Sequence, residues 1–174
     1  NATFKINSEY ENAMSDKEQA ISTIHLLAGQ RPDGQLIYED VHAKSVGDNC
    51  YELITSPIFA RGAAKSDVIR MLPAGRFEIE RHNGNLCIRI MAKNAIESIR
   101  QRLEAPFAAL GAELDYQNER TLVFSISVKA GFQAIEAALN EAIQQQDAVW
   151  MYANVYDPLD GETPLNWWHD YLAQ

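Results

Sequence analysis

The sequence has 174 residues, 47% of them hydrophobic, which suits one domain or two small packed ones with a core that needs no metal or disulfide. Lys and Arg number 15 against 24 Asp and Glu, a formal net charge of −9. This balance excludes nucleic acid as a partner, because phosphate backbones are bound by cationic side chains. The same excess of carboxylates would attract a basic protein.

Two cysteines, Cys50 and Cys87, are too few for a disulfide framework or a four-cysteine zinc site. They favour a reduced, cytoplasmic setting. No apolar run approaches the roughly 20 residues that span a bilayer, so no membrane partner is expected.

The first half of the chain predicts short strands behind a polar leader. Residues 1–20 form the leader, because their apolar positions are too scattered to define a face. Residues 21–84 form a β-rich half. Its strands are predicted at 21–28, 36–46, 50–55 and 68–72, with turn signals and an apolar run at 58–60 between them.

An Asn-Gly pair predicts a hairpin at the centre of the chain. Residues 76–81 and 86–91 flank His82-Asn83-Gly84-Asn85. Asn and Gly tolerate the positive φ angles of a tight type I′ turn. We expect this hairpin to stitch the two halves together.

Residues 85–156 predict a ferredoxin-like half. Two apolar stripes with spacings of three and four residues indicate helices: Ile96, Ile99, Leu103, Phe107 and Leu110, then Phe132, Ile135, Leu139 and Ile143. Strands are expected before, between and after them, which gives the split β-α-β order. The predicted fold is therefore α+β, with a small curled β-rich N-terminal half packed on a ferredoxin-like (split β-α-β) C-terminal half.

The stretch from Tyr38 to Arg89 carries Tyr51-Glu52-Leu53, Pro57 with Phe59, Asp67-Val68, and Gly84-Asn85 before Arg89. With these motifs the chain resembles an uncharacterised bacterial family, domain of unknown function four-two-six-five. It departs from the family pattern in having Lys65-Ser66 before the aspartate and Ile58 between the proline and the aromatic residue. The resemblance supports the fold order and implies no catalytic residue.

Residues 157–174 predict an acidic and aromatic tail with a short helix at 165–172. Its candidate partner-binding residues are Asp157, Asp160, Glu162, Trp167, Trp168 and Asp170, because tryptophan beside acids is typical of a protein-binding hot spot. The alternative is that one tryptophan docks the tail on the core and the other caps its edge.

No catalytic or metal-binding motif is found. The four histidines have no ligand spacing, there is no Gly-x-Ser-x-Gly elbow, and residues 60–66 lack the glycines of a phosphate-binding loop. We therefore expect no catalytic residue, metal or cofactor. One alternative site is kept around the central hairpin, formed by Asp67, His82 and Arg89.

The leading functional hypothesis is a non-enzymatic acidic binding protein, an immunity-type inhibitor of a basic bacterial toxin. Its carboxylates would substitute for phosphate in the toxin's cationic site. The alternatives are a small-molecule-binding regulatory domain, which would fit a homodimer, and an enzyme with a site that the sequence does not reveal.

Overall fold

Alternating buried and exposed side chains build a first sheet of five strands. The structure, a computed structural model, describes residues 20–173. The strands are β1 (Ile21–Gln30), β2 (Leu36–Gly47), β3 (Cys50–Leu53), β4 (Val68–Met71) and β5 (Phe77–Arg81). Each pairs antiparallel with the next in the chain, and a single 3-10 turn, η1 (Pro73–Gly75), precedes β5. In β2, Glu39, Val41 and Ala43 share the buried face.

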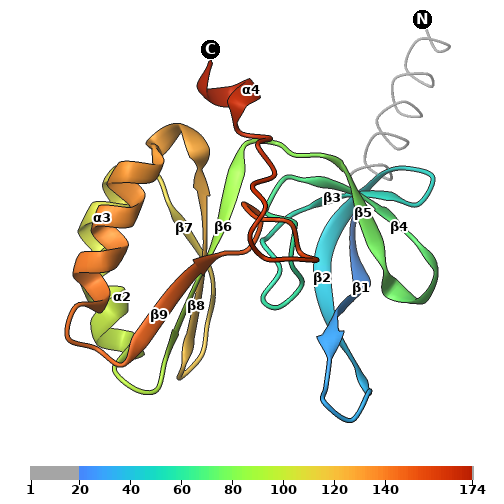
Figure 1. Cartoon of the computed structure of the whole chain (residues 1–174). Coiled ribbons are helices and arrows are strands. Elements are labelled where there is room, and N and C mark those ends of the chain that lie inside the picture. Colours follow the sequence, from blue (N-terminus) through green and yellow to red (C-terminus); the bar gives the residue numbers. More distant parts are fainter. Residues whose placement is uncertain (1–19, 174) are drawn as a thin grey trace, which may run out of the picture.

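A second antiparallel sheet carries both long helices. Its strands are β6 (Asn85–Ala92), β7 (Glu113–Gln117), β8 (Thr121–Ser127) and β9 (Ala148–Tyr152), in the spatial order β7-β8-β6-β9. Helices α2 (Ile96–Ala109) and α3 (Phe132–Ile143) cover one face of this sheet, and a 3-10 turn, η2 (Val128–Ala130), leads into α3 (Figure 1). The fold is therefore α+β with two antiparallel sheets.

Strand β6 separates the two apolar clusters of the second sheet. Leu86, Ile88 and Ile90 pack under the helices. Cys87, between them in sequence, lies on the opposite face against Ala64 of the first half. The period of two in an extended strand thus sends alternate residues of β6 into two different packed layers.

The central hairpin prediction is wrong. Strands β5 and β6 belong to different sheets, so residues 82–84 form a crossing between the sheets. Gly84 has a φ of 89° there, as the turn signal requires. The buried Asp67 accepts the N–H of Asn83 at 3.0 Å and redirects the chain, a contact that the local pattern does not contain.

Residues 54–67, which include the apolar run at 58–60, form a largely buried loop between the two sheets, from which the side chains of Phe59 and Arg61 are exposed. The Glu39 carboxylate accepts the N–H groups of Ile58, Phe59 and Ala60 at 2.9, 2.9 and 2.5 Å. From the second sheet, the guanidinium of Arg89 donates to the carbonyls of Pro57 and Phe59, each at 3.0 Å, and to that of Ala60. The loop can be buried because side chains replace the sheet hydrogen bonds it lacks.

The tail returns from the second sheet across both halves (Figure 1). Tyr156 and Pro164 form an isolated antiparallel bridge, and the N–H of Leu165 donates to the carbonyl of Val155 at 2.8 Å. The helix expected at 165–172 is shorter: α4 spans His169–Leu172. Pro164 belongs to the bridge, Asn166 has a positive φ of 61°, and residues 167–168 form a turn, so the helix cannot begin at residue 165.

Two sequence-based expectations remain. The polar leader, except for its last residue, lies outside the described residues. Within residues 20–173, none of the helices has the length and hydrophobicity needed to cross a membrane.

Candidate functional site

An aromatic and acidic hollow lies between β9, α3 and the start of the tail. Its volume is about 350 Å³. In β9, Trp150 and Tyr152 point to the helix-covered side of the sheet, as residues two apart in a strand must. The hollow is lined by Arg61, Glu136, Trp150, Met151, Tyr152, Ala153, Tyr156, Asp157, Pro158 and Gly161.

The rings of the hollow are held in place by contacts with α3. Trp150 and Tyr152 meet edge to face, with their centroids 5.1 Å apart. The indole N–H of Trp150 donates to Oδ1 of Asn140 at 2.8 Å, and the hydroxyl of Tyr152 donates to Oε1 of Glu136 at 3.2 Å. Burial, and then the Glu136 charge, raise the pKa of Tyr152, so the phenol stays a neutral donor beside a carboxylate.

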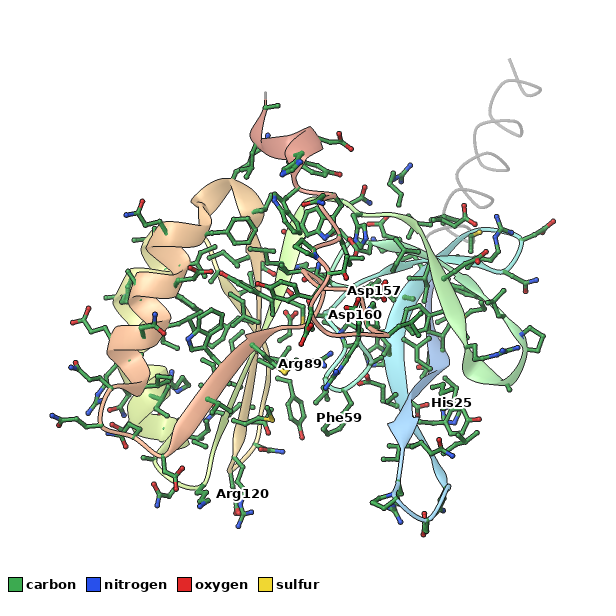
Figure 2. The ribbon with its side chains drawn as sticks, viewed as in Figure 1. His25, Phe59, Arg89, Arg120, Asp157 and Asp160 are labelled. Atoms are coloured by element: carbon green, nitrogen blue, oxygen red, sulfur yellow. The ribbon has the colours of Figure 1, made fainter. Side chains whose placement is uncertain are left out.

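The tail loop fixes its carboxylates through its own backbone. Oδ1 of Asp157 accepts the N–H of Leu159 at 2.9 Å. Asp160 accepts the hydroxyl of Thr163 at 2.5 Å and the N–H groups of Thr163 and Glu162 at 2.9 and 2.8 Å. These hydrogen bonds lower the pKa of Asp160, the one from the Thr163 hydroxyl contributing most and the two backbone ones less. The Asp160 carboxylate therefore remains charged. Figure 2 shows Asp157 and Asp160 close together near the middle of the molecule.

The predicted partner-binding residues divide into two groups. Asp160, Glu162 and Asp170 are exposed and Asp157 is half-buried. Trp167 is only 9% exposed and donates its indole N–H to the carbonyl of Asn154 at 2.7 Å. Trp167 therefore fits the alternative in which one tryptophan docks the tail on the core.

The two tryptophans of the tail have different surroundings. Trp167 stacks on His82, with ring centroids 5.0 Å apart and planes 20° apart. Trp168 is half-buried and meets the ring of Phe132 edge to face at 5.4 Å. Trp167 thus docks the tail on the junction between the halves, and Trp168 covers the end of α3.

The alternative site is only partly assembled. Nδ1 of His82 lies 3.0 Å from Oδ2 of Asp67, which is 0% exposed and also accepts the N–H of Ala64. Arg89 is not part of this pair, because its guanidinium is occupied by the carbonyls of residues 57, 59 and 60. The structure therefore unites Asp67 with His82 and places Arg89 in the buried loop instead.

The sequence analysis did not identify several residues of the hollow. Trp150 and Tyr152 alternate on one strand immediately before the acidic tail, and that proximity was the available signal. Glu136 gave none, because its place beside Tyr152 depends on how α3 packs on β9. In the part of the chain that the structure describes, no group of three or more His, Cys, Asp or Glu residues is arranged to hold a metal ion.

Comparison with known proteins gives a family and a fold. The family model described as domain of unknown function (DUF4265) matches residues 39–152. A crystal structure of a hypothetical protein from Neisseria gonorrhoeae has a TM-score of 0.64 and 15% sequence identity, over 78% of this chain and 95% of that one. That likeness shows a shared fold alone. No curated protein matches the chain.

Proposed function

This chain belongs to the DUF4265 family, a domain of unknown function, and we propose that it is a non-enzymatic acidic binding protein. Its partner is a basic protein, and one Lys or Arg side chain of that partner enters the hollow between β9, α3 and the tail loop. The proposal includes a cytoplasmic location, in keeping with two free cysteines.

The combination of rings and carboxylates in the hollow carries this proposal. Trp150, Tyr152 and Tyr156 supply aromatic faces, which attract a cation through the negative face of the ring. Glu136 and Asp157 supply negative charge, and with Arg61 also in the lining the hollow keeps a net charge of −1, from two carboxylates and one guanidinium. A cationic side chain fits this lining, and an anionic one does not.

An immunity-type inhibitor is the form of this function that the tail loop favours. A nuclease toxin binds phosphate with cationic groups, and Asp157, Asp160 and Glu162 present carboxylates to such a surface. The overall charge of −9 would also accelerate encounter with a basic partner. The bound toxin would then be blocked by occupation of its anion-binding site.

We also propose that the second half is ferredoxin-like. Its support is the element order from β6 to β9, which runs strand, helix, strand, strand, helix, strand. The spatial order β7-β8-β6-β9 and the position of both helices on one face point the same way.

The function is tested with two variants that each remove three negative charges. In the tail variant, Asp157→Asn, Asp160→Asn and Glu162→Gln keep the side-chain sizes of the loop. In the control variant, Asp33→Asn, Asp48→Asn and Glu119→Gln act in exposed turns far along the chain from the tail. Basic proteins retained from a lysate of the source organism at low salt and released at high salt are purified, and their affinity is measured by calorimetry.

The proposal expects the tail variant to weaken binding at least tenfold and the control variant to weaken it only a fewfold. Equal losses in both variants would show that the interaction is general charge attraction. A lysate from which wild-type protein retains no salt-sensitive basic protein would count against the binding function itself.

A further inference from the structure

A second hollow lies on the other side of the tail loop, and it differs in chemistry from the first. It has a volume of about 590 Å³, within the range of small-molecule sites of roughly 300–1,000 Å³. Its walls come from β5 and the tail, and its apolar lining includes Leu72, Phe77, Ile79, Leu159 and Leu165. We call it the β5 groove.

The charged groups of the β5 groove leave it with spare positive charge. Its lining holds two guanidiniums, of Arg61 and Arg76, and one carboxylate, of Glu78, which gives a net charge of +1. Glu78 also lies 3.7 Å from Nε of Arg70, a nitrogen that pairs more closely with Glu80. Arg61 and Arg76 line the groove as well, are exposed, and form no ion pair with any residue in the described part of the chain. Two arginines without an ion pair are unexpected in a protein whose net charge is −9.

His82 adds one polar group to the same groove. Its Nδ1 is engaged by Asp67 at 3.0 Å and its ring stacks on Trp167, so its orientation is fixed. Its Nε2 makes no hydrogen bond to any residue between 20 and 173. Because Nδ1 donates its proton to the Asp67 carboxylate, Nε2 is left as a hydrogen-bond acceptor. The donors for an anionic head group in this lining are therefore the two arginines.

We infer that the β5 groove binds a small carboxylic acid with an apolar tail, of the class of medium-chain fatty acids. The hydrocarbon chain lies along Phe77 and Ile79, which share one face of β5, and the carboxylate lies at the arginines. A peptide is disfavoured, because its backbone N–H and C=O groups would need partners that this apolar lining lacks. The groove shares Arg61 and Pro158 with the first hollow but is otherwise separate from it.

The test compares ligands that share a chain length and differ in head group. Octanoate, 1-octanol and octyltrimethylammonium are titrated into the whole protein by calorimetry, with acetate as a head group without a tail. The inference expects saturable one-to-one binding of octanoate, weaker binding of 1-octanol, and none of the cation or of acetate. Equal binding of all three octyl compounds would overturn it, as would the absence of saturable octanoate binding.

Paired variants test the position. Arg76→Gln should weaken octanoate binding about two- to fivefold, as expected for an exposed ion pair, while Arg120→Gln, in the turn between β7 and β8, should leave it unchanged. Leu159→Asp places a carboxylate in the groove wall and should reduce binding further, while the same exchange at Leu36, which is not in the lining, should not. Leu159 is 96% exposed and Leu36 is 45% exposed. Equal effects within either pair would place the ligand elsewhere.

These measurements are independent of the proposed protein partner. Octanoate binding involves the β5 groove, and the partner involves the first hollow and the loop carboxylates. A negative result for octanoate would leave the proposed protein partner untouched, and a negative result for the partner would leave the octanoate site untouched.

Discussion

Glu39 and Arg89 hold the same short piece of backbone from opposite sheets. The Glu39 carboxylate, on β2, accepts the N–H groups of Ile58 to Ala60, and the Arg89 guanidinium, on β6, donates to carbonyls of the same stretch. Both side chains are buried, at 8% and 5% exposure, which makes their hydrogen bonds costly to lose. Nε of Arg89 is buried without a partner in the part of the chain described. All the hydrogen bonds of this guanidinium to the loop come from its two terminal nitrogens.

Removing either side chain should destabilise the protein, and the two effects should not add. Glu39→Gln should cost about 1.5–3 kcal/mol, because an amide N–H₂ would face backbone donors, and Arg89→Met about 3 kcal/mol. Once one is removed the loop loosens, so the double variant should cost less than the sum by about 0.5–3 kcal/mol. Urea unfolding of the four proteins measures this, with Asp48→Asn as the exposed control. Additive losses would mean that the loop does not couple the two residues.

Gly84→Ala should destabilise more than Gly111→Ala. Both glycines have positive φ, 89° and 75°, so both changes carry backbone strain. A Cβ at Gly84 would also lie 3.0 Å from the ring of Tyr171, whereas one at Gly111 would meet nothing within 4 Å. Displacing Tyr171 would also break the hydrogen bond from its hydroxyl to the carbonyl of His82. We expect this to lower the free energy of unfolding by about 1 kcal/mol more in Gly84→Ala than in Gly111→Ala. Thermal unfolding compares the two; equal midpoints would place Tyr171 away from the crossing.

One thiol per chain should react quickly with a disulfide reagent. Cys87 is fully buried, and burial raises the pKa of its thiol to about 11, so the reactive thiolate is scarce at pH 8. Cys50 is partly exposed. In the folded protein we expect one fast and one slow reaction, with Cys50→Ser abolishing the fast one and denaturant making both fast. Two fast thiols in the native protein would contradict the burial of Cys87.

Glu97 should titrate far below the usual range for a glutamate. The hydrogen bonds from Arg100, followed by that from Gln117, lower its pKa from 4.5 to about 2. The sign follows: a depressed pKa favours folding above the unfolded value, near 4.5, and this contribution fades as the pH falls towards 2. NMR titration of the side-chain carboxyl should show the low value in the wild type and a return towards 4.5 in Arg100→Gln. An ordinary titration in the wild type would rule out a persistent contact.

Elements with a strong local pattern were predictable, and the relations between them were less so. The stripe from Ile96 to Phe107 matches the buried positions of α2, because amphipathic spacing is a local property. The turn at Gly84 was also recognised, since its positive φ is local. Which sheets the flanking strands join depends on Asp67, whose contact with Asn83 spans 16 residues and leaves no periodic trace.

The candidate site was predictable only at its acidic edge. Asp157 and Asp160 stood out by composition. For the two tail tryptophans the sequence left open a binding role or docking on the core, and it did not tell which one docks; Trp167 is the buried one, stacked on His82. Glu39 did leave a signal that was overlooked. It is a carboxylate on the same strand face as Val41 and Ala43, where a charged side chain needs a buried partner.

The neighbour-to-neighbour pairing of the first sheet also bears on how the chain folds during synthesis. All five strands of that sheet, and Glu39 with them, leave the ribosome before Arg89 does. Local pairings form quickly, whereas β6 must wait for β8 and β9 to complete its own sheet. Until the second sheet forms, the carbonyls of residues 57, 59 and 60 therefore lack the Arg89 guanidinium and hydrogen-bond to water instead.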